Sequence, residues 1–394
     1  MTLPLTRTCP HAPNPEYLRL QEEEPVYRAM TPSGVEAWVL TRHEDIRIML
    51  SDPRFSADRT KPGFPSLFAM PQVKAGSVRS LLFMDPPEHG PARRAVLGEF
   101  TVKRVAELRP RIHRIVHEHI DAMLAGPRPA DLVRALALPV PSLVVCELLG
   151  VPFADHEFFT ERATTLLKRD TPPEGRGQAI GDLRSYLDEL VAGKEADPPD
   201  DLFGRQIRKQ REAGGKADRE ALVSLGFLLL LAGHETTTNM ISLGVFGLLR
   251  HPAQLAVIRA DPAKTPGAVE ELLRYYSIID AGISRLALDD IEIGGVRIKA
   301  GEGVVGLPHV ADHDPEVFPD PLRFDVERGA RHHLAFGFGA HQCLGHNLAR
   351  AELQIVFDAL FARIPDLRLA VSEDQVPFKS DANVYGIYEL PVTW

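Results

Sequence analysis

The chain is poor in cysteine and has no unbroken apolar run long enough to cross a bilayer. Its three cysteines, Cys9, Cys146 and Cys343, are far apart and odd in number, which argues against a disulfide framework and for a reducing cytoplasm. The start of the chain lacks the basic segment and apolar core of a signal peptide. The longest strongly apolar stretch, residues 225–232, falls far short of the roughly 18–20 residues that span a membrane. We therefore expect a cytoplasmic protein with no membrane association.

An excess of basic charge is also missing. The formal net charge is −9 and the sequence pI is about 5.9, whereas nucleic-acid-binding proteins usually present a basic face. No internal repeat, low-complexity tract or linker divides the sequence. We expect one large domain over residues 1–394 and no nucleic-acid partner.

Periodicity predicts a mainly α protein with small β-sheets. Residues 26–29 and 36–41 flank a turn and are typical of a β-hairpin, and Gly294-Gly295 supplies the turn of a second hairpin at 291–298. The β-rich part is therefore expected at about 26–60 plus 285–310. The first 25 residues, 200–215 and 311–333 read as polar or irregular segments, the last as a long ordered meander. Helices are predicted at about 43–50, 90–99, 102–124, 130–149, 154–167 and 176–192.

A long central helix is the strongest single element. Asp218 is a good N-cap, and the helix should run to about Arg250, roughly 50 Å at ~1.5 Å per residue. Its apolar part is interrupted by the segment Gly-His-Glu-Thr-Thr-Thr at 233–238. A Thr hydroxyl there can bond a carbonyl one turn back and loosen the helix, and an acid beside a hydroxyl could relay protons. The alternative is a short polar turn bonded within the core. The zinc-protease pattern His-Glu-x-x-His fails, because its fifth position is Thr238.

Cys343 precedes a predicted amphipathic helix. Helix N-termini favour a thiolate, Gly337 and Gly339 permit a tight turn, and Gly345 leaves room for a flat ligand. One alternative is an inert small cysteine. Another is a zinc site, although it lacks the second ligand pair that structural zinc sites usually show; its members would be His332, His333, His341, Cys343 and His346.

At this point the sequence resembles the cytochrome P450 family. The pattern Phe-Gly-x-Gly-x-His-x-Cys-x-Gly at 336–345 matches the family's haem-binding signature at every fixed position, and the segments at 232–237, 271–274 and 85–93 resemble further family motifs in the same order. The resemblance covers nearly the whole chain and is closest in style to soluble actinobacterial members. It implies the cytochrome P450 fold, with the central helix crossing over haem b and Cys343 as the iron ligand.

Residue roles follow from the same resemblance. Glu235 and Thr236 correspond to the acid–alcohol pair that assists oxygen activation. Residues corresponding to those that line or hold the haem are Ala232, Phe336, Gly337, Gly345 and, at its propionates, His89, Arg93, Arg285 and His341. The pair Glu271 and Arg274 corresponds to a structural ion pair whose third partner we expect to be Arg323.

The resemblance also implies monooxygenase activity: one oxygen atom of O2 enters a C–H or C=C bond and the other leaves as water. No flavin or iron–sulfur motif is present, so electrons should come from a ferredoxin and its reductase. A basic docking patch for the ferredoxin is hypothesised at Arg93, Arg94, Lys103, Arg104, Arg331 and Arg350.

The sequence does not identify the substrate. Apolar candidates suit a mid-sized polyketide, terpenoid, steroid or xenobiotic: Phe64, Phe68, Met70, Leu81, Leu82, Leu228, Ile278, Ile279 and Ile283. Asp280 stands in an apolar run and could meet a polar substrate group. The alternatives are a haem-thiolate peroxygenase or isomerase, which often lacks the acid–alcohol pair, and a non-catalytic haem-binding sensor, which would need neither that pair nor a substrate cavity.

Overall fold

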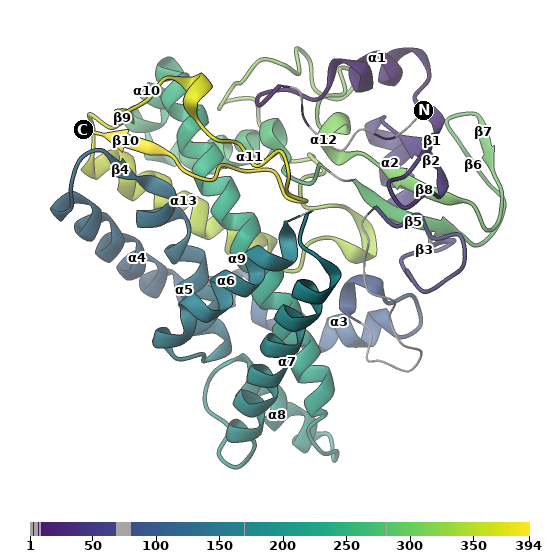
Figure 1. Cartoon of the computed structure of the whole chain (residues 1–394), viewed down its shortest axis with the longest axis horizontal. Helices are drawn as coiled ribbons and strands as arrows, with labels where there is room; N and C mark the ends of the chain where they lie inside the picture. Colours follow the sequence, from purple (N-terminus) through teal and green to yellow (C-terminus); the bar gives the residue numbers. More distant parts are fainter. Residues whose placement is uncertain (1–2, 4–6, 8, 68–79, 169, 281) are drawn as a thin grey trace.

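A computed structural model describes residues 3, 7, 9–67, 80–168, 170–280 and 282–394 (Figure 1). Its α-helices are α1 Pro15–Glu23, α2 His43–Ser51, α3 His89–Leu97, α4 Val102–Ala125, α5 Pro139–Leu149, α6 His156–Leu167, α7 Pro173–Glu195, α8 Leu202–Glu212, α9 Arg219–Arg250, α10 Pro252–Ala260, α11 Thr265–Tyr276, α12 Pro308–Ala311 and α13 His346–Arg363. Its strands are β1 Val26–Met30, β2 Glu36–Leu40, β3 Phe55–Ser56, β4 Ala130–Asp131, β5 Ile283–Ala287, β6 Ile291–Ile293, β7 Val296–Ile298, β8 Gly303–Gly306, β9 Arg368–Leu369 and β10 Pro391–Thr393.

The strands confirm both predicted hairpins. β1 and β2 pair antiparallel, and β6 pairs with β7 around Gly294 and Gly295, whose φ angles of 56° and 76° are left-handed. β1 and β2 join β8, β5 and β3 in a five-stranded sheet of order β1-β2-β8-β5-β3. This sheet forms one end of the molecule, and the helices form the other (Figure 1). The five-stranded sheet therefore lies about where the sequence placed the β-rich part, but a three-stranded sheet of order β4-β10-β9 lies outside the predicted regions.

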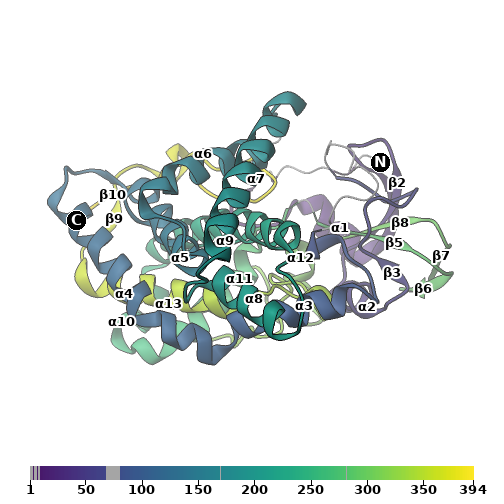
Figure 2. The same cartoon turned by 90° about the horizontal axis from the view of Figure 1, so that it is seen from below.

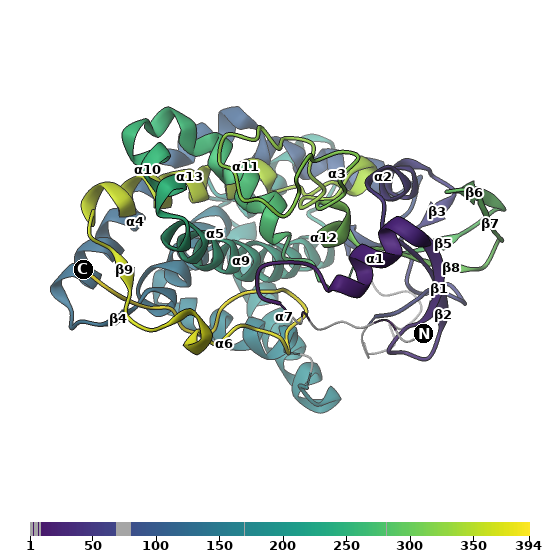
Figure 3. The same ribbon diagram turned by 90° about the horizontal axis from the view of Figure 1, so that it is seen from above.

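The helices are stacked in layers around α9. In Figures 2 and 3, α9 and α5 lie between a layer with α6 and α7 and a layer with α4, α11 and α13. The side chain of Asp218 accepts a hydrogen bond from the Ala221 N–H, which confirms the predicted N-cap. By length and composition alone α9 could cross a membrane, but more than half of its most apolar window is buried inside the protein. We interpret α9 as the core helix of the fold.

Two helical predictions need correction. Residues 130–149 do not form one helix, because a short strand at β4 and a π-helical turn at Val133–Ala137 precede α5, which begins at a proline that has no N–H to donate. The charged segment 200–215, expected to be solvated, contains α8. One face of α8 is buried, with Leu202, Phe203 and Ile207 fully enclosed. α1 was also missed, since its apolar residues are few and lie after four prolines.

A C-terminal hairpin reaches back to the central helix. The Lys379 N–H donates to the Gly386 carbonyl and the Tyr388 N–H to the Pro377 carbonyl, each at 2.9 Å. We call residues 377–388 the C-terminal hairpin. A Cβ atom at Gly386 would lie 2.2 Å from Asn239 Oδ1 on α9, so only glycine allows this close approach. The hairpin thereby brings Lys379 against the middle of α9.

Candidate active site

The Cys343 loop is a tight turn that ends at α13. The Cys343 N–H donates to the Phe336 carbonyl at 2.8 Å, and Gly337 and Gly339 adopt left-handed φ angles of 66° and 67°. A Cβ at Gly339 would lie 2.3 Å from the Leu50 carbonyl oxygen, whereas a Cβ at Gly337 or Gly345 would meet nothing within 4 Å. The loop is therefore packed on one side and open on the other. Gly345 is the N-cap of α13, so Cys343 lies just before a helix N-terminus, as predicted.

The Cys343 thiol does not ionise easily in the protein alone. Although the side chain retains accessible surface, surrounding protein atoms desolvate the sulfur and raise its pKa, and the Gly345 N–H and the Arg93 and Arg350 charges offset this only in part. The backbone N–H at the helix N-terminus favours the thiolate, as expected, but burial has the larger effect on the pKa. A coordinated metal cation deprotonates a thiol outright, so the ligand itself would supply the missing stabilisation.

Four basic side chains that the sequence assigned to propionates are brought together. The His89 and His341 rings stack with centroids 4.0 Å apart. Arg93 and Arg285 lie close enough to lower the pKa of both histidines, to about 3 at His341, although burial is the larger cause. Both imidazoles are therefore neutral donors at pH 7, whereas the sequence left their charge open. We call His89, Arg93, Arg285 and His341 the propionate group.

The propionate group fits an anionic ligand. Arg285 is 7% exposed, yet within the described part of the chain its guanidinium donates only to the Ser284 carbonyl. Burial lowers the pKa of Arg285 to about 10, and Asp85, the acid that counteracts this, is bound to Ser56 and the Ala57 N–H. His89 Nε2 is buried and has no hydrogen-bond partner among the residues that the structure describes. Among the described residues, no carboxylate pairs with Arg285 or Arg93. Since buried charges are normally paired, the two carboxylates of haem would complete this group.

The structural ion-pair cluster is confirmed with one correction. Arg274 donates to both carboxylate oxygens of Glu271, at 2.7 and 2.8 Å, and both side chains are fully buried. The third partner is Arg328, whose Nε lies 3.2 Å from Glu271 Oε1. The predicted third partner, Arg323, is wrong: its side chain is 63% exposed and faces Asp325, and only its backbone carbonyl accepts from the cluster.

A neighbouring ion pair links this cluster's helix to the Cys343 loop. Arg350 on α13 donates to both oxygens of Glu270 on α11, and the Arg350 guanidinium lies over the Phe336 ring at 4.6 Å. His333 Nε2 also approaches Glu270, at 3.2 Å. These contacts fix the turn that carries Cys343 against the helical core.

One accessible stripe lies on the first half of α9. Leu228, Ala232 and Thr236 recur every four residues and are half-buried or exposed. Several residues between 225 and 233 are also half-buried, whereas residues 237–248 are buried throughout. Residues spaced by four lie on one helix face. The Thr236 hydroxyl donates to the Ala232 carbonyl at 2.6 Å, which confirms the predicted bond to the carbonyl one turn back, while α9 continues as an uninterrupted helix through this segment. Thr236 and Ala232 therefore share one accessible face.

Glu235 points elsewhere, to a partner that sequence reasoning missed. Its carboxylate, 5% exposed, binds Lys379 Nζ of the C-terminal hairpin at 2.5 Å. Lys379 also donates to Asn239 Oδ1 at 2.9 Å. Burial raises the pKa of Glu235, but Lys379 and His234 outweigh it, so the net pKa is lowered. No local signal joins positions 144 residues apart, although a lone Lys in an apolar stretch near the C-terminus is one hint.

The substrate candidates are accessible to different degrees. Phe64, Leu81, Leu228, Ile279 and Ile283 are half-buried and Leu82 is exposed. Ile278 is buried in the main core, which favours packing over substrate contact. Phe68 and Met70 lie outside the described residues. Asp280, expected to meet a polar substrate group, instead forms a buried ion pair with Arg7.

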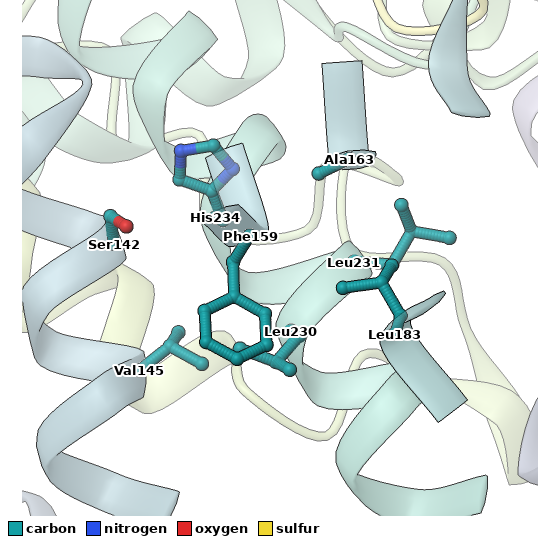
Figure 4. Close-up of a pocket in the computed structure, with 8 residues that line it drawn as sticks. All are labelled: Ser142, Val145, Phe159, Ala163, Leu183, Leu230, Leu231 and His234. Carbon is teal, nitrogen blue, oxygen red and sulfur yellow. The ribbon is translucent and has the colours of Figure 1, made fainter. Parts of the chain in front are cut away.

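A small pocket between α5, α6, α7 and α9 is not the substrate site. Figure 4 shows the Ser142 hydroxyl and the His234 ring among apolar side chains there. None of its lining residues belongs to the Cys343 loop or the propionate group. It is a packing gap beneath the helices that cover α9.

The remaining hypotheses can also be compared with the structure. No group of three or more His, Cys, Asp or Glu side chains that could hold a metal ion occurs in the described part of the chain, so the zinc alternative is wrong. Of the six residues in the hypothesised docking patch, Arg104 pairs with Glu107 and Arg350 with Glu270, while Arg94, Lys103 and Arg331 remain exposed.

Comparisons with known proteins agree with the geometry. A family model described as cytochrome P450 matches residues 265–381, which include the Glu271–Arg274 pair and Cys343. Cytochrome P450 105A3 of Streptomyces carbophilus is 49% identical over 394 residues, covering 99% of this chain and 95% of that protein. Vitamin D3 dihydroxylase of Streptomyces griseolus is 47% identical, covering 99% and 96%. The crystal structure of cytochrome P450 MoxA from Nonomuraea recticatena superposes with a TM-score of 0.93 at 58% identity, covering 100% and 98%.

Proposed function

We propose, on the premise that the chain belongs to the cytochrome P450 family and is a monooxygenase, that it hydroxylates or epoxidises a mid-sized, largely apolar small molecule with O2. The observation that carries the proposal is the pairing of two features. One is an open-sided cysteine turn beside a group of basic side chains whose arginines form no ion pair with any described carboxylate, and the other is a stripe on α9 that ends at Thr236.

In this family haem is held by a cysteine thiolate, and when bound it supplies the activation of O2. The chain's own residues would ligate the iron, orient the bound haem and deliver protons. The Cys343 sulfur is the ligand, and the propionate group neutralises and orients two carboxylates. The Thr236 hydroxyl, already hydrogen-bonded to the Ala232 carbonyl, can hold a water or an oxygen atom on the accessible stripe. Glu235 takes protons from the side of the C-terminal hairpin and must exchange Lys379 for water to pass them on.

The substrate class rests on the accessible apolar residues and on the relatives. Phe64, Leu81, Leu82, Leu228, Ile279 and Ile283 offer no charge, and the Asp280 carboxylate is taken by Arg7. Such a surface selects by shape and apolar area. One relative is named for hydroxylating vitamin D3, which has that chemical character. We infer a steroid-like, terpenoid or polyketide secondary metabolite or a xenobiotic as the substrate.

Electrons would come from outside the chain. No sequence motif provides for a flavin or an iron–sulfur cluster, so we propose a ferredoxin and its reductase as donors, in the cytoplasm. The exposed Arg94, Lys103 and Arg331 would attract an acidic ferredoxin. Added salt should then slow reduction, since screening weakens steering between exposed charges; a rate independent of salt would exclude the patch.

The first test is the absorption spectrum of the purified protein after reduction with dithionite and addition of carbon monoxide. A thiolate-ligated complex gives a long-wavelength Soret band, and Cys343→Ser should lose that band while Cys146→Ser, a buried cysteine elsewhere, keeps it. Absence of haem after expression with adequate supply would refute the proposal. A short-wavelength band in the unmodified protein would mean that the thiolate is lost or protonated.

The same sample can then be screened with candidate substrates for the low-to-high spin shift. With a substrate so identified, Thr236→Ala should raise peroxide release relative to product, because the hydroxyl no longer directs protons. Thr238→Ala is the matched control, since its hydroxyl donates to the His234 carbonyl inside the core. Unchanged coupling in Thr236→Ala would remove Thr236 from the mechanism.

A further inference from the structure

Arg7 is buried against residues that are distant from it in the sequence. Its side chain, 4% exposed, binds the Asp280 carboxylate at 2.6 Å and the carbonyls of Tyr276 and Ser277 at 2.6 and 2.9 Å. Its guanidinium also covers the Tyr385 ring, with Cζ 4.1 Å from the centroid. A single arginine thus joins the N-terminal segment, the residues after α11 and the C-terminal hairpin. Figure 3 shows the purple N-terminal segment running beside the yellow C-terminal one.

Tyr385 contacts the N-terminal segment, the residues after α11 and the opposite arm of the C-terminal hairpin. Its hydroxyl donates to the Pro10 carbonyl at 3.1 Å, and its N–H donates to the Ile278 carbonyl at 2.9 Å. Its ring stacks on Phe378, on the opposite arm of the hairpin, with centroids 5.9 Å apart. The Tyr385 side chain is therefore clamped between Arg7 and the hairpin itself.

The hairpin transmits this clamp to α9. Gly386 follows Tyr385 and accepts the Lys379 N–H, and Gly386 also packs directly on Asn239. Lys379, 8% exposed, then reaches Glu235 and Asn239. The titratable groups around Glu235 are Lys379 and Tyr388 from the hairpin and His234 from its own helix.

We propose that Arg7 is a positioning residue for Glu235: by clamping Tyr385 it fixes the C-terminal hairpin in the register that places Lys379 against the Glu235 carboxylate. The inference rests on the proposed proton-delivery role of Glu235 and extends it, because it assigns control of that acid to a residue 228 positions away in the chain. Arg7 itself touches neither Glu235 nor the accessible stripe of α9 in any contact recorded for the described residues.

Loss of Arg7 should raise the pKa of Glu235. Lys379 holds the pKa of Glu235 down against the effect of burial. If Arg7 is lost, Tyr385 is no longer clamped and Lys379 loses its fixed position, so burial dominates and the pKa of Glu235 rises. A rise of about one unit means roughly tenfold more of the protonated acid at a given pH above the pKa.

The experiment is a pH titration of the full-length ferric holoenzyme by infrared difference spectroscopy. The C=O band of protonated Glu235 is identified by its absence from Glu235→Gln. In the unmodified enzyme no such band should appear between about pH 5 and 8, because the pKa lies below its ordinary value near 4.5. Arg7→Met and Lys379→Met should each bring the band into this range, and the double variant should add nothing to Lys379→Met alone.

Controls separate positioning from general destabilisation. Arg19→Met removes an exposed arginine of α1 that pairs with Glu16 and Glu23, and it should leave the band absent. Arg7→Lys keeps the charge and should restore part of the effect. If Arg7→Met does not fold, Asp280→Asn weakens the same clamp without changing side-chain volume, and a band in the same range but weaker is expected.

The outcomes distinguish failure of the positioning role of Arg7 from failure of the proposed catalytic role of Glu235. A band in Lys379→Met but in neither Arg7→Met nor Asp280→Asn overturns the role of Arg7, and no band in Lys379→Met overturns the whole chain of contacts. If the bands appear as expected but Glu235→Gln leaves the ratio of peroxide to product unchanged, the positioning stands and the catalytic role of Glu235 fails.

Discussion

Two groups of basic side chains in this protein differ in the anions that accompany them. In the structural ion-pair cluster, Arg274 and Arg328 surround the buried Glu271 carboxylate, and backbone carbonyls take the remaining donors. In the propionate group, Arg285 is also buried but donates, among the described residues, only to a backbone carbonyl. The first group is complete within the protein, whereas the second is complete only with an anionic ligand. An unmatched buried cation therefore marks a binding site more clearly than a matched one does.

The largest expected effect is in the complete group. Arg274→Met leaves the fully buried Glu271 with Arg328 as its one remaining cation, and breaking a buried pair costs about 3–5 kcal/mol. We expect the free energy of unfolding to fall by that amount in denaturant titrations. The control is Arg297→Met, whose exposed pair with Asp290 should contribute little to stability, because solvent screens exposed ion pairs. Equal losses in the two variants would remove the distinction between a structural cluster and a surface pair.

The ion pair between Glu270 and Arg350 extends the comparison to stability at low pH. Burial raises the pKa of Glu270, but hydrogen bonds from Arg350 and His333 outweigh it and lower the pKa to about 2 from an ordinary 4.5. Because the folded-state pKa is depressed, the stabilisation is fully present above pH 4.5 and is lost as the pH falls towards 2. A shift of this size corresponds to at most about 3 kcal/mol. Glu270→Gln should remove that part of the acid dependence.

The measurement is the free energy of unfolding of both proteins at a series of pH values from about 6 down to 3. The difference between the two curves should shrink as the pH falls below 4.5, because Glu270 takes up a proton in the unfolded chain while the folded carboxylate, with a pKa of about 2, stays charged. Parallel curves would mean that Arg350 and His333 do not hold the carboxylate in its charged form. Glu373→Gln, at an exposed acid paired with Arg250, is the control for removal of one surface charge.

These contrasts also show what the sequence could and could not predict. The Cys343 turn, the N-cap at Asp218 and both hairpins were predictable because each depends on residues close together in the chain. The family pattern correctly placed His89 beside His341. It did not reveal the third partner of Glu271, because Arg323 and Arg328 lie in the same irregular meander and only the three-dimensional path selects between them.

Long-range contacts escaped prediction for the same reason. Lys379 meets Glu235 across 144 residues and Arg7 meets Asp280 across 273, and neither pair has a periodicity that links its members. The direction in which Glu235 points was also not predicted. Glu235 and Thr236 are adjacent in the sequence, but a helix turns about 100° per residue, so the two side chains point in different directions. The acid consequently faces the C-terminal hairpin, while the alcohol faces the accessible stripe.

In the propionate group, replacing a buried arginine should not lower the stability of the haem-free protein. Arg285→Gln removes a buried cation that pairs with no carboxylate of the described residues, so the haem-free protein should be as stable as the unmodified one or more stable. Retention of haem should weaken by about tenfold, or about 1.4 kcal/mol, because one charge-assisted hydrogen bond is lost. Transfer of haem to an acceptor protein measures retention, and thermal unfolding of the haem-free protein measures stability. A loss of both together would place Arg285 with the structural residues.

The smallest effect is expected at Arg323, which separates the predicted partner of Glu271 from the observed one. Its exposed side chain has Asp325 at 3.6 Å as its only ion-pair partner among the described residues, so Arg323→Ala should change the free energy of unfolding by less than about 0.5 kcal/mol. Arg328→Ala removes a donor from buried Glu271 and should cost about 1–3 kcal/mol. Both arginines lie in one meander and undergo the same substitution, so composition and chain position are matched. If Arg323→Ala proved the more destabilising of the two, the carboxylate of Glu271 would have to face Arg323 in solution, and the cluster would have to be redrawn around the partner that the sequence first indicated.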